Sequence, residues 1–369
     1  MKRFAIAAGG TGGHLFPGLA VAEVLHARGH QVMVLISEKK IDEVATEGRS
    51  EFRLERLPGM GMPRSVSMET ARFLLRFVRG VLHCRRLFAE FKPAAILGMG
   101  GFTSTAPILA GRTGGLPVFV HESNAIAGKA NRLNAKLCGG LLVGFAGFSD
   151  ERVRVPVTVT GTPLRKNLLH APAREDALRR FGLESNRPTV LIMGGSQGAS
   201  GINRAMSDTA KLFRQKGGDI PQFIHITGLA DESTVRKAYE SAGVRAWVGA
   251  FHHAMQDAYA AADLAVARSG AASLTELAHF GLPSVLIPYP HAAEDHQSWN
   301  ARIFRDAGAA EVLREPEASP EVLMRTIETL LEPGRRLELV EAARALSGKL
   351  AAEKVADILI EASAKGGMA

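Results

Sequence analysis

Residues 4–14 read FAIAAGGTGGH, and residues 190–200 read VLIMGGSQGAS. In each stretch, an apolar run typical of a buried strand leads into a glycine-rich loop that precedes an apolar helical segment. Glycine lets the backbone approach a ligand closely, and the N–H groups at a helix start attract phosphate oxygens. The two stretches therefore predict an α/β protein with two nucleotide-fold halves that face one shared cleft.

Composition supports two domains and gives no sign of disulfides. The chain has 369 residues, 46% hydrophobic and 6% aromatic, and contains 39 glycines. This length suffices for two cores, and the glycine content suits tight strand-to-helix turns. The two cysteines, Cys84 and Cys138, have neither disulfide-framework nor metal-ligand spacing, which favours a reducing cytoplasm. The sequence has no run of about 20 apolar residues to predict a membrane span.

Strand and helix patterns alternate along both halves, which predicts mostly parallel sheets. The expected elements are a helix at 17–28, strands at 31–36, 94–98, 117–122 and 158–164, strands at 190–193, 222–227, 246–248, 264–267 and 284–288, and a helix at 335–364. We place the domain boundary near Gly161, giving a first domain of 1–161 and a second of 162–340. A C-terminal helix at about 341–369 is expected to pack back on the first domain.

The positive charge is concentrated in the first half. Residues 1–161 hold 21 Lys and Arg against 12 Asp and Glu, whereas the remainder holds 24 against 25. Within 64–92, basic side chains recur at helical spacing on one stripe, namely Arg72, Arg76, Arg79, His83 and Arg86. Phe73, Phe77 and other apolar residues cover a broad remaining arc.

This arc is wider than one core-facing stripe requires, so part of it is a candidate for lipid contact beside arginines that bind anionic headgroups. A core helix with a solvated basic face is the alternative. Nucleic acid is disfavoured as a partner, because the sequence shows neither interleaved exposed aromatics nor helix-turn-helix or zinc-finger spacing.

The glycine loops do not fit the usual cofactor patterns. Leu15 occupies a position that the dinucleotide fingerprint requires to be glycine, and neither loop ends in the Gly-Lys-Ser/Thr of a nucleoside-triphosphate loop. Hydride transfer and ATP hydrolysis are therefore disfavoured. Tight turns without a ligand remain the alternative for both loops.

A third cluster, RSGAASLTE at 268–276, has small residues at an expected helix start, where N–H groups can hold a diphosphate. Glu276 lies about one turn further on, and a carboxylate can accept hydrogen bonds from both hydroxyls of a ribose. An alternative is that Glu276 only interacts favourably with the helix dipole.

The polar residues at 291–300 suit sugar hydroxyls or a capped loop. Neither His-Glu-x-x-His nor Asp-x-Asp occurs, so we expect no metal site and no cofactor.

Taken together, these segments resemble the MurG family of glycosyltransferases over nearly the whole chain. The resemblance rests on GGTGGH at 9–14, GMGGF at 98–102, HESNAIAG at 121–128, GTPLR at 161–165, GGSQGA at 194–199, RSGAASLTE at 268–276, GLPSVLIPYP at 281–290 and DHQSWNA at 295–301. It implies a GT-B fold and transfer of N-acetylglucosamine from UDP-N-acetylglucosamine to a lipid-linked muramoyl-pentapeptide, converting lipid I to lipid II in peptidoglycan synthesis.

The resemblance also implies a set of donor contacts. From the first domain these are Thr11, Gly12, Gly13 and Asn124, and Arg165 lies at the crossing between the domains. From the second domain they are Ser196, Phe251, His252, Ala271, Ala272, Ser273, Leu274, Thr275, Glu276 and Gln297. The uracil is expected to pair with backbone near Phe251 and His252. The sequence departs from the family at His252, where an aliphatic residue is usual, and at Ser123, where glutamine is usual.

The implied chemistry is an inverting displacement in which the acceptor hydroxyl attacks the anomeric carbon and UDP leaves. His14 is the first candidate for the base because an imidazole titrates near working pH, although it could instead cap the loop. Glu122 is the second candidate, although it could only brace its loop.

The expected location is peripheral, on the cytoplasmic face of the bacterial inner membrane, with the stripe of Arg72, Phe73, Arg76, Phe77, Arg79 and Arg86 on anionic lipid. The resemblance also suggests other cell-wall synthesis proteins as partners. Another GT-B enzyme that uses a UDP-sugar, such as a glycolipid glycosyltransferase or an epimerase, remains an alternative, as does a non-catalytic membrane scaffold.

Overall fold

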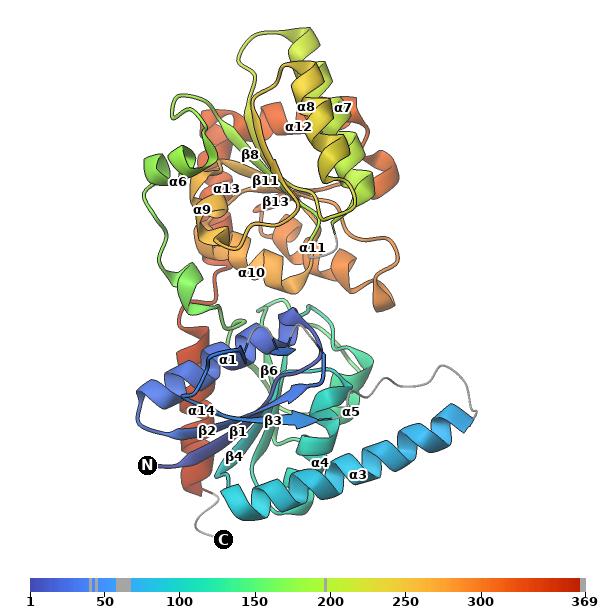
Figure 1. Cartoon of the computed structure of the whole chain (residues 1–369), viewed down its shortest axis with the longest axis vertical. Helices are drawn as coiled ribbons and strands as arrows, with labels where there is room; N and C mark the ends of the chain where they lie inside the picture. The colour runs from blue at the N-terminus through green and yellow to red at the C-terminus, as the bar shows by residue number, and fades with distance from the viewer. Residues whose placement is uncertain (40–41, 44–45, 58–67, 196–197, 366–369) are drawn as a thin grey trace. The chain divides into compact units, whose positions relative to one another are not determined.

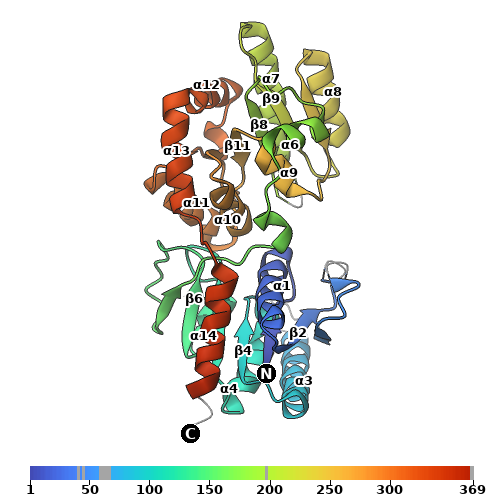
Figure 2. The same ribbon diagram turned by 90° about the vertical axis from the view of Figure 1, so that its left-hand side faces the viewer.

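The computed structural model describes residues 1–39, 42–43, 46–57, 68–195 and 198–365. The chain forms two compact units (Figures 1 and 2), of which unit 1 comprises Met1–Arg165 and Gly348–Ala369, and unit 2 comprises Lys166–Ser347. The chain therefore passes from one unit to the other after Arg165 and returns after Ser347.

Unit 1 contains a sheet whose seven strands are parallel and lie in the order β3-β2-β1-β4-β5-β6-β7. The strands are β1 Arg3–Ala7, β2 Gln31–Ser37, β3 Arg53–Leu57, β4 Ala95–Gly98, β5 Val118–Glu122, β6 Gly140–Val143 and β7 Val157–Val159. The helices are α1 Gly12–Ala27, α3 Met68–Phe91, η1 Phe102–Ser104, α4 Thr105–Thr113, α5 Lys129–Ala135 and α14 Ala351–Lys365.

Unit 2 repeats this plan with six parallel strands in the order β10-β9-β8-β11-β12-β13. The strands are β8 Thr189–Met193, β9 Gln222–Ile226, β10 Ala246–Gly249, β11 Leu264–Ala267, β12 Ser284–Leu286 and β13 Ala310–Val312. The helices are η2 Lys166–Leu169, α6 Arg174–Phe181, α7 Ser200–Lys216, α8 Glu232–Ala242, α9 Met255–Ala261, α10 Ala271–Phe280, η3 Ala293–Asp295, α11 His296–Asp306, η4 Glu315–Glu317, α12 Pro320–Leu331 and α13 Pro333–Ala345.

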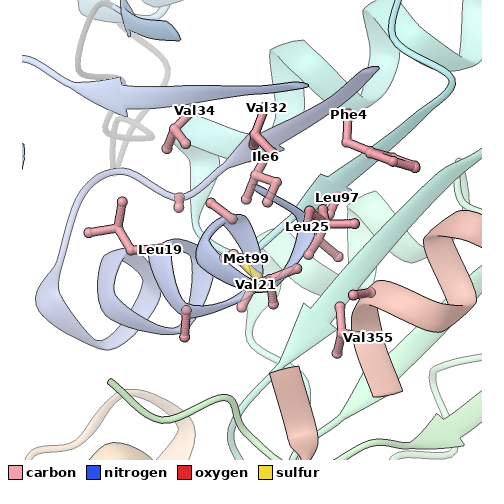
Figure 3. Packing of buried hydrophobic residues seen from close by; sticks show 14 of the residues in the cluster. Phe4, Ile6, Leu19, Val21, Leu25, Val32, Val34, Leu97, Met99 and Val355 are labelled. Carbon is pink, nitrogen blue, oxygen red and sulfur yellow. The ribbon is translucent and has the colours of Figure 1, made fainter. Parts of the chain in front are cut away.

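Alternation along β1 divides the core of unit 1 into two layers. Phe4 and Ile6 pack with α1 and α14 on one face (Figure 3), and Val355 of α14 belongs to this cluster. Ala5 and Ala7 face the other layer, which includes the buried residues of α3 and α4. Because helices cover both faces, the central strands β1 and β4 are buried and largely apolar, as is usual in parallel sheets. In Figure 2, α14 runs along α1 and β4.

The strand order of each sheet reverses at one point, between β1 and β4 in unit 1 and between β8 and β11 in unit 2. Ligands of open α/β sheets bind at such switch points, beyond the carboxyl ends of the strands. Both glycine-rich loops leave the sheet at these points, since they follow β1 and β8.

The structure corrects several expected elements. The first helix begins at Gly12, five residues before Pro17, so it starts within the glycine loop. The strand expected at 158–164 ends at Val159, and β3, β6 and β13 were not expected. The single helix expected over 335–364 is instead two helices, α13 and α14. The segment between the two helices ends at Leu350, which has a left-handed φ of 57°.

Candidate functional site

The first glycine loop connects β1 directly to the start of α1. Thr11 is the N-cap residue, and its carbonyl accepts hydrogen bonds from the N–H groups of His14 and Leu15 at 3.1 and 3.0 Å. Gly12 and Gly13 form the first turn of α1 and are partly exposed. The helix start is therefore positioned at the switch point with its positive dipole end toward any ligand there.

The ring of His14 lies against the loop that follows β4. Its Nδ1 is 3.2 Å from Oγ1 of Thr11. A Cβ atom on Gly100 would lie 3.0 Å from Nε2 of His14, and one on Gly101 would lie 3.4 Å from the same ring. Both glycines have left-handed φ angles, +111° and +70°. Two of the glycines in GMGGF therefore leave the space that the histidine ring occupies.

The electrostatic surroundings of His14 favour a neutral imidazole. Burial lowers the pKa of His14 below its usual value, and Lys39 lowers it further. The carboxylates of Glu122 and Asp42 oppose this shift in the pKa. A neutral ring near physiological pH can accept a proton, which is what a general base must do.

Glu122, at the end of β5, is occupied by its own loop. Its Oε1 accepts hydrogen bonds from the backbone N–H and side-chain amide of Asn124, both at 2.9 Å. Its Oε2 accepts from the N–H of Gly128 at 3.0 Å and from Nδ2 of Asn131 at 2.9 Å. The carboxylate is 4% exposed. These four bonds support the bracing role for Glu122, and they also hold Asn124.

Two further residues of unit 1 connect this region to the chain crossing. The buried ring of His121 places Nε2 3.0 Å from the carbonyl of Gly161, and burial lowers the pKa of His121. The guanidinium of Arg165 lies over the ring of Phe16, 4.7 Å from its centroid. Arg165 is therefore positioned beside α1, within one turn of the glycine loop.

The second glycine loop is tightly packed at both ends. A Cβ atom on Gly194 would lie 2.4 Å from the backbone nitrogen of Ala199, and one on Gly198 would lie 2.2 Å from the carbonyl oxygen of Thr227. Ser196, a predicted donor contact, lies outside the described residues. The helix that follows, α7, begins at Ser200.

The donor contacts predicted at 271–276 form the first turns of α10, directly beyond β11. Ala272 is exposed and Ser273 and Glu276 are partly exposed, whereas Ala271, Leu274 and Thr275 are buried. A ligand at this helix start can therefore reach the side chains of Ser273 and Glu276 and the backbone of the others. Tyr259 of α9 was not singled out from the sequence, yet its hydroxyl donates a 2.6 Å hydrogen bond to Glu276 Oε2.

The segment after β12 is hydrogen-bonded to the residues that precede α10. Oε1 of Gln297 accepts from the N–H of Tyr289 at 3.0 Å, and the carbonyl of Gln297 accepts from the hydroxyl of Ser269 at 2.8 Å. Arg268 donates to the carbonyls of Ile287 and Pro288 at 3.1 Å. Gln297 therefore lies close to the start of α10. Residue spacing in the sequence could not have predicted that Arg268, directly after β11, donates hydrogen bonds to the carbonyl groups that follow β12.

The segment predicted to pair with uracil contains His252, the position at which the chain departs from the family pattern. Phe251 is 47% exposed. The ring of His252 instead packs against Phe181 and Trp247, with centroids 4.9 and 5.3 Å apart, and burial lowers the pKa of His252. The side chain of His252 is thus held in an aromatic cluster with Phe181 and Trp247.

The basic helix α3 exposes several large apolar side chains. Leu74, Leu75, Val78 and Leu82 are 58, 52, 47 and 59% exposed. Arg72, Arg76, Arg79 and Arg86 are also exposed, whereas Phe73 and Phe77 stack on each other and pack on the core of unit 1. The exposed apolar residues are therefore leucines and a valine in place of the two expected phenylalanines. Among the described helices, none is both long and apolar enough to cross a bilayer.

Comparison with known proteins identifies relatives of the whole chain. Residues 4–142 match the glycosyltransferase family 28 N-terminal domain, and residues 189–359 match the glycosyltransferase family 28 C-terminal domain. The UDP-N-acetylglucosamine--N-acetylmuramyl-(pentapeptide) pyrophosphoryl-undecaprenol N-acetylglucosamine transferase of Geobacter sulfurreducens is 38% identical over 365 residues, covering 98% of each chain.

Solved structures agree with this relationship. MurG from Acinetobacter baumannii superimposes with a TM-score of 0.78 at 27% identity, over 98% of this chain and 100% of that one. UDP-GlcNAc 2-epimerase from Neisseria meningitidis gives a TM-score of 0.68 at 14% identity, over 98% of this chain and 100% of that one, which shows a shared fold only. The expected GT-B class is confirmed by these neighbours and by the two parallel sheets. The chain belongs to the MurG family within glycosyltransferase family 28.

Proposed function

We propose that this protein transfers N-acetylglucosamine from UDP-N-acetylglucosamine to the muramoyl sugar of undecaprenyl-diphospho-muramoylpentapeptide, the step from lipid I to lipid II in peptidoglycan synthesis. The observation that carries the proposal is similarity along 98% of both chains to a transferase whose name states this reaction. The loop that carries His14 follows β1, and the helix that carries Glu276 follows β11, and these strands border the switch points of the two sheets.

Unit 2 is the proposed donor-binding domain. The start of α10 supplies backbone N–H groups and a helix dipole to the diphosphate, and Glu276 accepts hydrogen bonds from the ribose hydroxyls. As the glycosidic bond to UDP breaks, negative charge grows on the diphosphate. Donors that are fixed beforehand stabilise this charge without reorganisation.

Unit 1 is the proposed acceptor domain, with His14 as the base. A neutral His14 takes the proton of the acceptor hydroxyl as that oxygen attacks the anomeric carbon and UDP leaves on the opposite side, so the configuration inverts. The geometry favours His14 over Glu122, because both carboxylate oxygens of Glu122 already accept hydrogen bonds from residues 124–131.

The α3 surface, defined here as Leu74, Leu75, Val78 and Leu82 with the exposed arginines beside them, is the proposed membrane contact. Apolar side chains that enter the headgroup region gain free energy from burial, and arginines next to them attract anionic lipid. This contact would hold unit 1 on the cytoplasmic face of the inner membrane, where the polyprenyl acceptor resides, and where other cell-wall synthesis proteins are accessible as partners.

The test is acceptor-dependent release of UDP in the presence of a chelator, with a short-chain lipid-linked muramoyl-peptide as acceptor. We expect turnover by the wild type and by His26→Ala, which changes a histidine at the other end of α1. We expect turnover to be at least about a hundredfold lower in His14→Ala, and to be strongly reduced in Glu276→Ala. A folded, UDP-binding wild type that releases no UDP would contradict the proposal and favour another GT-B enzyme or a scaffold. Conversion of UDP-N-acetylglucosamine to its epimer without acceptor would identify an epimerase.

A further inference from the structure

Both backbone groups of Gly10, in the middle of the first glycine loop, are held by side chains from the segment that follows β2. The N–H of Gly10 donates to Oδ2 of Asp42 at 2.8 Å. The ammonium of Lys39 donates to the carbonyl oxygen of Gly10 at 2.7 Å. Gly10 has a φ of +112°, a backbone conformation that residues with side chains rarely adopt. The loop is therefore held in a conformation that requires glycine at this position.

Asp42 is fully buried, which is unusual for a carboxylate. Its Oδ2 also accepts from the backbone N–H of Ser37 at 2.9 Å and from the hydroxyl of Ser37 at 2.5 Å. Its Oδ1 is buried and has no hydrogen-bond partner among the described residues. Burying a charged group in this way costs free energy, and the bonds from Gly10 and Ser37 are what offset it.

The loop is packed directly on the end of β2. A Cβ atom on Gly9 would lie 2.3 Å from the backbone nitrogen of Ser37 and 3.0 Å from Oδ2 of Asp42. His14 follows four residues after Gly10, and its N–H is bonded to Thr11. A displacement of Asp42 would therefore be transmitted to Gly10, then to the first turn of α1 and to the imidazole.

We propose that Lys39 and Asp42 are positioning residues that clamp Gly10 from both sides and thereby set the geometry of the α1 start and of His14 for sugar transfer. The inference rests on the proposed function for its kinetic consequences. It goes beyond that function by assigning a role to two residues that are not among the predicted donor contacts.

The two charges of the clamp also act on the titration of His14. The charged or titratable groups that act on His14 are Glu122 of β5, Asp42, Lys39 and the neighbouring His121. Asp42 raises the pKa of His14, and Lys39 lowers it. Removing the two clamp charges one at a time should therefore move the titration of His14 in opposite directions.

The informative variants are Asp42→Asn and Lys39→Met. Asparagine can keep its oxygen toward Gly10 and Ser37 and place its amide at the unpartnered Oδ1 position, so it removes the charge with little change of shape. Lys39 is exposed, so Lys39→Met is not expected to disturb folding. Glu43→Gln is the matched control, because Glu43 is one residue away but forms a surface ion pair with Arg56.

Two measurements test the clamp. The first is an NMR titration of the His14 ring in the full chain without substrate, where we expect a lower pKa in Asp42→Asn, a higher one in Lys39→Met and no change in Glu43→Gln. The second is transfer kinetics, where we expect kcat to fall roughly tenfold in both clamp variants and about a hundredfold in Asp42→Ala, because small displacements of a catalytic group are costly. UDP affinity should stay unchanged.

The outcomes separate this proposal from the function on which it rests. Unchanged His14 titration with wild-type kcat in both clamp variants would overturn the clamp and leave the transferase intact. If the wild type shows no transfer, opposite shifts of the His14 pKa in Asp42→Asn and Lys39→Met would sustain the link between the clamp and His14 and overturn the function. Shifts in the same direction in both variants would indicate general loosening of the loop, and would also overturn the clamp.

Discussion

The hydroxyl of Tyr259 on α9 donates a 2.6 Å hydrogen bond to Oε2 of Glu276 on α10. Tyr259 is 3% exposed and belongs to the core of unit 2, whereas Glu276 is partly exposed at its surface. A buried donor thus fixes the direction of a carboxylate that we assign to the ribose. This bond connects the packing of unit 2 to its proposed affinity for UDP.

Tyr259→Phe is expected to weaken UDP binding about tenfold. The change removes one hydrogen bond to a charged group, worth about 1.5 kcal/mol or more, and with it one restraint on the direction of the Glu276 carboxylate. Isothermal titration calorimetry with UDP measures the effect. Tyr239→Phe, the same change at another buried tyrosine of unit 2, should bind UDP like the wild type. Equal affinity in Tyr259→Phe and Tyr239→Phe would show that the bond does not orient Glu276.

The pH profile of transfer should reflect the lowered pKa of His14. A base must be neutral to act, so the acidic limb of kcat/KM is expected below pH 6.5, the ordinary histidine value. His14→Gln should remove this limb and lower kcat by about 10² to 10⁴, the range typical of a lost general base. The His26→Gln enzyme should keep both the acidic limb and the wild-type kcat. An acidic limb unchanged in His14→Gln would assign the base elsewhere.

Acid should destabilise unit 2 through His225. This buried ring lies between Asn203 and Tyr239, at 3.0 and 3.2 Å, and burial lowers its pKa to about 3. The unfolded chain binds a proton below pH 6.5 while the folded one does not, so stability falls as pH drops from 6.5 toward 3. The loss between pH 7 and pH 5 is about 2 kcal/mol.

Urea unfolding followed by tryptophan fluorescence measures this loss, because Trp247 and Trp299, the two tryptophans of the chain, both lie in unit 2. His225→Gln should reduce the pH 7 to pH 5 difference by about 2 kcal/mol, whatever its overall stability. His291→Gln, at an exposed position, should retain the wild-type difference. The same pH dependence in both variants would place the titrating group elsewhere.

The α3 surface should control membrane binding without affecting UDP. Leu74→Glu with Leu82→Glu is expected to reduce binding to anionic vesicles more than a hundredfold, since each leucine contributes about 1.5–3 kcal/mol on burial and the new charges add repulsion. Vesicle co-sedimentation measures this effect. Leu229→Glu with Leu337→Glu changes two leucines of unit 2 that are 77 and 63% exposed, and should bind vesicles normally. Equal loss in both double variants would exclude a specific α3 contact.

Several features were predictable because they depend on local pattern. Apolar runs such as 190–193 indicate buried parallel strands, since both faces of such strands are covered, and glycine clusters mark the turns that follow them. The strands that were missed are short or polar. β3, Arg53–Leu57, carries three charged side chains, and β13 has only three residues, so neither has enough periodicity to be recognised.

In the candidate site, too, some residues were predictable from local sequence and others were not. GGTGGH, HESNAIAG and RSGAASLTE indicated His14, Glu122 and Glu276 because motifs are contiguous in sequence. Tyr259 and Asp42 act on two of those motifs from 17 and 32 residues away, through the bonds to Glu276 and Gly10. Single-sequence spacing contains no information about such partners, because strand order and register bring them together.

By itself, then, the sequence determined that the chain forms two parallel α/β halves with ligand-binding turns, since periodicity and glycine placement are local properties of the chain. Only the tertiary structure decided that Glu122 is engaged by its own loop and that Phe73 and Phe77 pack inward while the leucines of α3 stay exposed. Those outcomes depend on which neighbours satisfy each polar atom and cover each apolar face, and packing across distant segments sets both.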